Sequence, residues 1–416
     1  MSYLNYRHQN LFLEDVDLAE IAQEFGTPCY VYSKQAIQHN WQNFYLPLKD
    51  SSQRSKIYYA VKANANLTIL NLLSSLGAGF DVVSGGEIAR ALAAGGLAQD
   101  IIFSGVGKSH AEIRQAIDLG IYSIHVESIS ELLRIQDIAQ NMNKRVNIAI
   151  RVNPDIDVQS HPYISTGSKD NKFGIDYKQA FDVYKTAAKL SHLNIKGISC
   201  HIGSQITSLA PFTKAATEIF NLVDALAHNK INLQYVDLGG GLGISYNDEQ
   251  VPSPQEYIQA LLEQLNGRNL ELHLEPGRAL VANAGILLTK IEYIKKTANN
   301  NFAIVDAAMN DLIRPALYQS FHQIMPVTLT TNTQPELNYS IVGPVCESGD
   351  FLGIDRKLKI NEGDLLAVKD CGAYGFSMSS NYNTRLRCAE VLVDHAQTKL
   401  IRQRETMHQL LENERL

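Results

Sequence analysis

Ile57-Tyr58-Tyr59-Ala60-Val61-Lys62-Ala63-Asn64 is an apolar, β-prone run that stops at a lysine and then passes into a segment with helical spacing. Such a run predicts a short buried strand. A lysine at the end of a buried strand loses hydration, which lowers its pKa and frees the amine to form a Schiff base. Lys62 is therefore the candidate reactive residue, and the alternative is a solvated lysine at a loop edge.

Similar apolar runs recur along the chain, and eight of them are typical of buried parallel strands. They are Ile57–Val61, Phe80–Val83, Ile101–Phe103, Ile121–Val126, Val146–Val152, Ile195–His201, Tyr235–Leu238 and Leu270–Leu274. Between them lie segments with helical spacing of apolar residues, such as Glu87–Ala94, Ile129–Gln140, Phe212–Ala227 and Tyr257–Leu265. This alternation predicts an α/β fold, a (β/α)8 TIM barrel, with a doubly wound open sheet as the competitor.

After Arg278 the pattern changes to short segments rich in β-branched and aromatic residues, separated by turn residues. These segments include Phe302–Val305, Val327–Thr330, Tyr339–Val342, Leu365–Val368 and Cys388–Val393. They predict a second, mostly β domain, a β-barrel or sandwich. The polar end, Gln397–Leu416, is expected to be a surface helix or a frayed tail.

The N-terminal region adds a short amphipathic segment, Leu18–Phe25, and a strand within Thr27–Tyr32. That strand has no partner in a barrel that starts near Ile57, so we expect it to pair with the β domain. The predicted domains are residues 1–36, an N-terminal segment that pairs with the β domain, 37–279, the barrel, and 280–416, the β domain with a terminal helix.

Composition is that of an ordinary globular protein, with 416 residues, 45% hydrophobic and 19% charged. The net charge of -6 argues against a nucleic-acid or anionic-membrane surface. Met1–Asn10 has no apolar core, and no apolar run has the length of about 18 residues that a membrane span needs, so neither a signal peptide nor a span is expected. The five cysteines are widely spaced, without a CxxC pair, which favours free thiols in a reducing cytoplasm.

The barrel prediction places an active site at the C-terminal ends of the strands. Polar or glycine-rich residues follow every predicted strand there. In strand order they are Lys62; Asp81 and Ser84; Ser104; Glu127; Arg151 and Asn153; His201; Gly239-Gly240-Gly241-Leu242-Gly243; and Glu275-Pro276-Gly277-Arg278. The candidate site is therefore drawn from all eight strand ends.

The last two of these loops are where barrels commonly bind phosphate. Glycines such as Gly239, Gly240 and Gly241 let backbone N–H groups approach a phosphate, although a glycine-rich loop is more often only a tight turn. A lysine, a phosphate site and a carboxylate together suggest pyridoxal phosphate. Glu275 is the expected partner of its ring nitrogen, with a turn-capping glutamate as the alternative.

Two more residues near the sixth strand are candidates for the same site. His201 stands at a strand end, which favours a flat ring lying against the cofactor, although a lone histidine in an apolar strand is commonly a core residue. Ser204 follows it and is a candidate phosphate donor.

These motifs resemble the diaminopimelate decarboxylase family, within the alanine racemase-like, fold-type III pyridoxal phosphate enzymes. The resemblance runs from Tyr30 to Val393. The motifs that carry it are Tyr59-Ala60-Val61-Lys62-Ala63-Asn64, His161-Pro162-Tyr163-Ile164-Ser165-Thr166-Gly167, Lys172-Phe173-Gly174-Ile175, His201-Ile202-Gly203-Ser204-Gln205, Glu275-Pro276-Gly277-Arg278, Arg314-Pro315-Ala316-Leu317-Tyr318, Cys346-Glu347-Ser348-Gly349-Asp350 and Gly372-Ala373-Tyr374-Gly375. The chain departs from the family at Leu386, where proline is usual, and at Cys388, which puts only local backbone geometry in doubt.

The resemblance implies a role for each site residue. Lys62 would hold the cofactor, and Cys346 would return a proton to the carbon that loses carbon dioxide. Without the resemblance, Cys346 is merely a loop cysteine. Arg278 and Arg314 would bind the distal carboxylate of the substrate, and Glu347 its distal ammonium.

The rest of the implied site includes Tyr318 and Tyr374, which would complete the substrate and cofactor shell, and Asp81 and Gly277, which would help to bind the cofactor. The resemblance also implies a homodimer in which the Cys346-Glu347 loop completes the partner's site. Three alternatives remain: a sister decarboxylase acting on ornithine, arginine or carboxynorspermidine, a racemase of the same fold, and a non-catalytic pyridoxal phosphate carrier.

Overall fold

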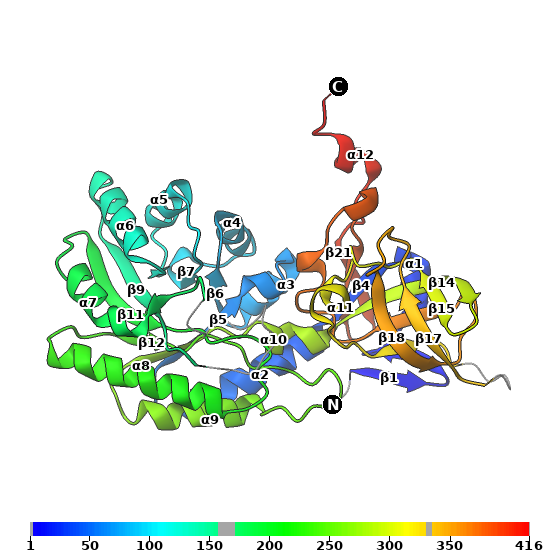
Figure 1. Cartoon of the computed structure of the whole chain (residues 1–416), viewed down its shortest axis with the longest axis horizontal. Coiled ribbons are helices and arrows are strands. Elements are labelled where there is room, and N and C mark those ends of the chain that lie inside the picture. The colour runs from blue at the N-terminus through cyan, green and yellow to red at the C-terminus, as the bar shows by residue number, and fades with distance from the viewer. Residues whose placement is uncertain (1–2, 157–170, 330–334, 416) are drawn as a thin grey trace. The chain divides into compact units, whose positions relative to one another are not determined.

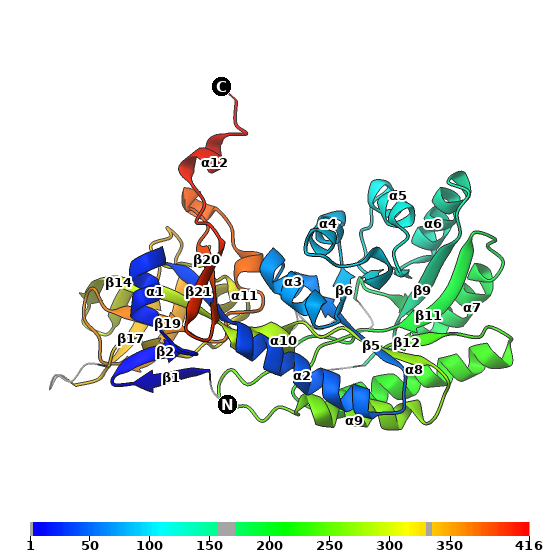
Figure 2. The ribbon, with the colours of Figure 1, turned by 180° about the vertical axis from the view of Figure 1, so that it is seen from behind.

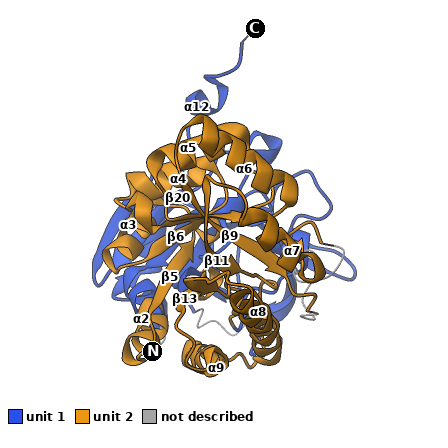
Figure 3. Cartoon of the chain, turned by 90° about the vertical axis from the view of Figure 1, so that its left-hand side faces the viewer, with its two compact units in different colours: residues 1–40, 245–249, 280–416 blue, residues 41–244, 250–279 orange. Residues whose placement is uncertain are grey.

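The computed structural model describes residues 3–156, 171–329 and 335–415. The chain forms two compact units, coloured separately in Figure 3. Unit 1 comprises residues 1–40, 245–249 and 280–416, and unit 2 comprises residues 41–244 and 250–279. The motif at His161–Gly167 lies outside the described residues.

Unit 2 is a closed barrel of parallel strands. Its strands are β5 (Ser55–Ala60), β6 (Gly79–Val82), β7 (Ile101–Phe103), β8 (Ser123–Val126), β9 (Val146–Asn153), β11 (Leu193–Ser199), β12 (Tyr235–Asp237) and β13 (Glu271–Leu274). Each strand pairs in parallel with the next, and β13 pairs with β5, which closes the ring. The predicted TIM barrel is confirmed, and the open sheet is excluded (Figure 1).

Helices surround this barrel (Figure 3). They are α3 (Leu67–Ser75), α4 (Gly85–Ala93), α5 (His110–Leu119), α6 (Ile129–Asn141), α7 (Tyr177–Ala187), α8 (Ala210–His228) and α9 (Pro254–Leu265), preceded by α2 (Lys34–Asp50), and β10 (Ile175–Asp176) adds a short parallel pairing to β9. Among the described helices, none is long and apolar enough to cross a bilayer.

Serine caps fix where several helices begin, and so how long the strand-end loops are. The side chains of Ser84, Ser109, Ser128 and Ser253 each accept a hydrogen bond from the backbone N–H of a glutamate three residues later. Ser84, one of the strand-end polar residues singled out above, is therefore a helix cap. Because the barrel strands are parallel, their C-terminal ends and the side chains that follow them lie at one rim of the barrel.

Unit 1 is mostly β and takes strands from both ends of the chain. Its main sheet contains β4 (Cys29–Ser33), β14 (Gly285–Lys296), β15 (Asn301–Val305), β16 (Ile324–Pro326), β17 (Leu337–Val342), β18 (Phe351–Leu358), β19 (Leu365–Val368), β20 (Ala389–Asp394) and β21 (Gln397–Arg402). β4 pairs antiparallel with β14 and parallel with β20. The prediction that the N-terminal strand joins the later sheet is confirmed.

A buried apolar cluster explains that pairing. It brings together Leu11, Cys29, Val31, Ile286, Leu288 and Val391, from strands at both ends of the chain. The helix α1 (Leu18–Phe25), predicted from its amphipathic spacing, packs its buried residues into the same cluster. A small sheet of β1 (Leu4–Arg7), β2 (Asn10–Leu13) and β3 (Val16–Asp17), which the sequence analysis did not predict, lies in the same unit (Figure 2).

Three predictions in this unit were wrong or incomplete. In the described part of the predicted strand Val327–Thr330, Thr328 makes a single β-bridge, to Asn10, and the strand β16 lies just before it at Ile324–Pro326, where an edge position tolerates a proline without an N–H. The polar residues 397–402 form the strand β21 against β20, and only Met407–Leu411 form a terminal helix, α12. The longest of the described strands, β14, was not predicted.

Candidate active site

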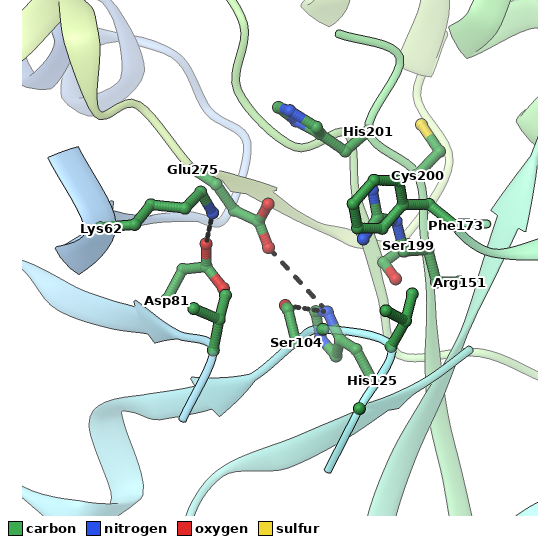
Figure 4. Close-up of a pocket in the computed structure, with 14 residues that line it drawn as sticks. Lys62, Asp81, Ser104, His125, Arg151, Phe173, Ser199, Cys200, His201 and Glu275 are labelled. Atoms are coloured by element: carbon green, nitrogen blue, oxygen red, sulfur yellow. Dashed lines mark hydrogen bonds and ion pairs between the residues drawn. The ribbon is translucent and has the colours of Figure 1, made fainter. Parts of the chain in front are cut away.

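A pocket of about 370 Å³ lies at the C-terminal ends of the barrel strands (Figure 4). Its lining comes from the ends of seven strands and their loops: Lys62, Asp81, Val83, Ser104, Gly105, Val106, Gly107, His125, Arg151, Phe173, Ser199, Cys200, His201 and Glu275. Its volume falls in the usual range for small-molecule sites, about 300–1,000 Å³. Six of the strand-end residues predicted for the site are brought together here: Lys62, Asp81, Ser104, Arg151, His201 and Glu275.

Lys62 reaches the pocket from η1 (Val61–Ala63), the single turn that follows β5. Its Nζ lies 2.7 Å from Oδ2 of Asp81, whose side chain is fully buried in β6. The side chain of Lys62 is 36% exposed, so its dehydration is less complete than the sequence analysis expected. The ion pair places the amine inside the pocket rather than in solvent.

Glu275 follows β13 and projects into the same space as Lys62 (Figure 4). Burial raises the pKa of Glu275 well above its usual value, and the nearby Asp237 and Asp81 raise it further, while Lys62 and Arg151 oppose them. Burial also raises the pKa of Asp237 to about 6. A cationic group beside Glu275 would offset the effect of these two aspartates and favour the carboxylate form of Glu275.

His201 is held as a neutral ring. Burial, with Arg151 and Lys62 adding to it, lowers the pKa of His201 well below its usual value. Its Nδ1 accepts a hydrogen bond of 3.2 Å from the backbone N–H of Gly240, so the proton of the neutral ring is on Nε2. A flat, neutral ring suits stacking against an aromatic cofactor.

The glycine-rich loop after β12 is packed tightly between its neighbours. A Cβ added at Gly240 would lie 2.1 Å from the backbone oxygen of Glu275, and one at Gly241 would lie 2.3 Å from that of Gly203. The N–H of Gly239 donates to Asp237 Oδ1 at 2.8 Å. Glycine is therefore required at these positions because three loops approach one another too closely to leave room for a Cβ.

The loop after β13 is tied to the loop after β11. Nη2 of Arg278, at the start of α10 (Arg278–Val281), donates to Ser204 Oγ at 3.0 Å. A Cβ at Gly277 would lie 3.1 Å from the Cβ atoms of Ala60 and Ala63, which flank Lys62. Ser204, Gly277 and Arg278 thus border the strand ends that carry Lys62 and His201.

The other predicted site residues belong to unit 1 and are not among those gathered in the pocket. Arg314 begins α11 (Arg314–Tyr318), is buried, contacts His322 Nε2 at 2.9 Å and lies 4.6 Å over the ring of Tyr246. Tyr318 ends that helix, and Tyr374 has a positive φ of 56°. Cys346 and Glu347 are exposed between β17 and β18, and the N–H of Cys346 donates to Asn383 Oδ1.

All five cysteines are free thiols, as predicted. Two buried polar atoms of the pocket wall, Asp81 Oδ1 and Ser199 Oγ, have no hydrogen-bond partner among the described residues. Buried polar atoms of this kind are usually satisfied, which makes both of them candidates for contact with a bound molecule.

Sequence reasoning missed several wall residues, among them His125, Phe173 and Ser199. His125 lies on β8, with Nδ1 3.9 Å from Glu275 Oε1 and 3.3 Å from Ser104 Oγ. Burial lowers the pKa of His125 well below its usual value. The available signal was strand alternation, because His125 stands two residues before Glu127, the polar residue predicted at the end of that strand.

Comparison with known proteins identifies the family of the chain. The model of the pyridoxal-dependent decarboxylase family, pyridoxal binding domain, matches residues 34–282. The chain is 52% identical to the diaminopimelate decarboxylase of Pseudomonas aeruginosa, over 100% of this chain and 99% of that protein. The chain belongs to the diaminopimelate decarboxylase family of pyridoxal-dependent decarboxylases.

Solved structures of this family agree with the fold. Diaminopimelate decarboxylase from Helicobacter pylori, complexed with L-lysine, has a TM-score of 0.91 at 41% identity, covering 95% of this chain and 98% of that one. The M. jannaschii enzyme, in co-complex with L-lysine, has a TM-score of 0.94 at 38% identity, covering 99% and 98%. This decarboxylase family is therefore matched in both the barrel and the β unit.

The cofactor of the family is pyridoxal phosphate, and the residues present fit it. An amine at Lys62, a carboxyl at Glu275 that a cation would stabilise and the unsatisfied Asp81 Oδ1 and Ser199 Oγ surround one cavity of suitable volume. When bound, the cofactor supplies an electron sink for the electrons left behind by a departing carboxylate. Glu275 would keep the ring nitrogen protonated, and His201 would support the ring face.

Proposed function

We propose that this protein catalyses the pyridoxal phosphate-dependent decarboxylation of meso-2,6-diaminopimelate to L-lysine and carbon dioxide, the last step of lysine biosynthesis. The observation that carries the proposal is the pocket that joins Lys62, Asp81 and Glu275 in a chain 52% identical, over its full length, to a diaminopimelate decarboxylase. The reaction releases one carboxylate as carbon dioxide and takes up one proton at the same carbon.

Within this proposal, residues of unit 2 bind the cofactor. Lys62 holds it covalently, Asp81 orients the Lys62 amine, and Glu275 faces the ring nitrogen. The phosphate lies against the glycine-rich segments, and the residues assigned to it are Ser204, Gly239, Gly240, Gly241, Gly277 and Arg278. This assignment is supported by the way these segments are interlocked beside Lys62 and His201.

Further residues are assigned to the substrate. Arg278 and Arg314 bind its distal carboxylate as charge-assisted donors, and Glu347 binds its distal ammonium. Tyr318 and Tyr374 complete the shell. The Sγ of Cys346 returns the proton to the reacting carbon, a role suited to an exposed thiol.

We further propose that the enzyme is a cytoplasmic homodimer with shared active sites. Free thiols at all five cysteines fit a reducing compartment. A two-fold interface would create two equivalent sites, each completed by the Cys346-Glu347 loop of the partner.

The test is direct. Carbon dioxide and L-lysine release should be measured from meso-diaminopimelate, with ornithine, arginine and carboxynorspermidine offered to parallel samples. The proposal is supported if diaminopimelate is the only one of these four amino acids that is turned over. Preferential turnover of another amino acid, racemisation without carbon dioxide release, or cofactor binding without turnover would each replace it with one of the three alternatives.

A further inference from the structure

Glu127 does not line the pocket, yet it contacts three segments of the pocket wall. It follows β8 and its side chain is 2% exposed. Its Oε1 accepts from the N–H of Gly105 at 2.9 Å and from Arg151 Nη1 at 2.7 Å, and its Oε2 accepts from the N–H of Gly174 at 2.8 Å. One buried carboxylate therefore joins the loop after β7, the end of β9 and the segment that leads into β10.

Each of these donors sets part of the pocket surface. Gly105 and Arg151 line the pocket directly, and Gly174 follows Phe173, which also lines it. The guanidinium of Arg151 lies 4.9 Å over the ring of Phe173. Figure 4 shows Arg151 and Phe173 on the side of the pocket away from Lys62. Displacing the Glu127 carboxylate would remove the hydrogen bonds that hold these three segments of the pocket wall in place.

A second buried ion pair, between Lys108 and Glu131, holds Glu127 in place. The N–H of Glu127 donates to Glu131 Oε2 at 2.6 Å, and Glu131 Oε1 accepts from Lys108 Nζ at 2.8 Å. Lys108, with a side chain only 1% exposed, also donates to the backbone oxygens of Gly105 and His125. Buried polar groups that are satisfied in this way form a rigid network.

The network also fixes a charge. Burial alone would raise the pKa of Glu127, but Arg151, Lys108 and the Gly174 N–H together lower it below its usual value, so Glu127 is an anion. The charge of Arg151 favours the carboxylate form of Glu275 and the neutral form of His201. The position of Arg151 therefore affects the two groups that face the cofactor ring.

We propose that Glu127 is a positioning residue, which holds Arg151, Gly105 and the Phe173-Gly174 segment in the geometry that binds pyridoxal phosphate. The inference concerns the cofactor, so it holds whichever amino acid the enzyme decarboxylates. Glu127 itself touches neither cofactor nor substrate.

The test compares Glu127→Gln with Glu112→Gln. Glu112 is a matched control, because its carboxylate also accepts three hydrogen bonds, from the N–H groups of Gly85 and Ser109 and from Ser109 Oγ, but none of these residues lines the pocket. Two readouts apply: the dissociation constant for pyridoxal phosphate, and hydrogen exchange of the holoenzyme in peptides that contain Gly105 or Gly174.

In Glu127→Gln the dissociation constant should rise about tenfold or more, the change expected when a hydrogen bond to a charged group is lost. Exchange should accelerate in both peptides, whereas Glu112→Gln should change exchange only near Gly85 and Ser109. A dissociation constant within twofold of the unsubstituted enzyme, or exchange at Gly105 and Gly174 no faster than in Glu112→Gln, overturns the proposal.

If Glu127→Gln does not fold, because it leaves Arg151 buried without a partner, two further variants decide. Arg151→Met removes one charge, and Glu127→Gln with Arg151→Met removes both. In Arg151→Met, Glu127 can still accept from the N–H groups of Gly105 and Gly174, so the double variant should exchange faster in both peptides and bind pyridoxal phosphate more weakly than Arg151→Met. Equal exchange and equal binding in these two variants would overturn the proposal.

Discussion

The amine of Lys62 lies 2.7 Å from a carboxylate that solvent does not reach, at the end of the strand β5. Lys62→Ala should therefore abolish decarboxylation and remove the absorbance band of protein-linked cofactor. Borohydride reduction followed by peptide mapping should label Lys62. Lys56→Ala is the control, because Lys56 lies on the same strand, pairs with Asp100 and is absent from the pocket lining. A label on any other lysine would contradict the assignment.

Arg314 is the residue on which substrate choice is proposed to depend. Losing a bidentate, charge-assisted contact costs about 2 kcal/mol or more, so Arg314→Ala should lower kcat/KM for diaminopimelate at least ~20-fold with cofactor binding nearly unchanged. Arg356→Ala is a matched control, since Arg356 also stacks on an aromatic ring, that of Phe321 at 3.9 Å, in the same unit. Equal kinetics in both variants would remove Arg314 from the site.

Glu275 gives the stability of the enzyme a specific pH dependence. A carboxyl whose pKa is raised in the folded chain stabilises the fold below its ordinary pKa, and this contribution is lost as the pH rises through the folded value. Burial raises the pKa of Glu275 well above its usual value. Without cofactor, the melting temperature should therefore fall more between about pH 5 and about pH 8 in the unsubstituted enzyme than in Glu275→Gln.

Thermal melts of both proteins across that pH range make the measurement. Added pyridoxal phosphate should flatten the curve of the unsubstituted enzyme, because a protonated ring nitrogen supplies the opposite charge. Parallel curves for the two proteins would mean that folding does not raise the pKa of Glu275.

Among the strands, the sequence predicted those that the pattern of apolar residues alone determines. All eight barrel strands were found because a strand buried on both faces reads as a continuous apolar run. The strand β21 was misread because its residues are half-buried or exposed, so no apolar pattern marks it. The strand β14 mixes a buried half with a lysine-rich exposed half, which is not typical of either strand class.

The same distinction, between what a local sequence pattern marks and what it does not, applies to the residues of the site. Lys62 and Glu275 were predictable because the barrel assigns chemistry to strand ends. The contacts of Glu127 with Gly105 and Gly174 were not, because they depend on how three loops fold over one another. No spacing in the sequence encodes that arrangement.

The loop after β12 carries a prediction of its own. In Gly240→Ala the new Cβ would lie 2.1 Å from the backbone oxygen of Glu275, so the loops must separate. Overpacking of this kind costs about 1–3 kcal/mol, and we expect a lower urea midpoint together with weaker cofactor binding. Gly86→Ala is the control, since its Cβ would meet only Ser84 Oγ, at 3.7 Å. Indistinguishable midpoints would show that close approach at Gly240 is not needed.

For the whole molecule, the shared-site dimer predicts complementation between two inactive variants. Lys62→Ala and Cys346→Ala dimers should each be impaired, and mixing them under conditions that exchange subunits should restore activity. With random exchange, half of the dimers are mixed, and each mixed dimer has one site with both lesions and one with neither. Recovery should therefore approach about a quarter of unsubstituted sites.

Subunit exchange must be verified separately, for example with two differently tagged chains. No recovery despite proven exchange, or full activity in a monomer, would exclude the shared-site arrangement and leave the proposed reaction intact.

The pairing of β4 with β14 and β20 has a consequence for the order in which the protein can fold during synthesis. All the strands of the barrel lie between residues 55 and 274, whereas unit 1 needs residues 29–33 and 389–394 in the same sheet. A hydrogen bond between the His395 N–H and Glu14 Oε2 spans 381 positions. On the ribosome, β4 therefore has no partner until β14 emerges after the last barrel strand, and its pairing with β20 must follow synthesis of almost the whole chain, so the barrel is able to form before the sheet of unit 1 is complete.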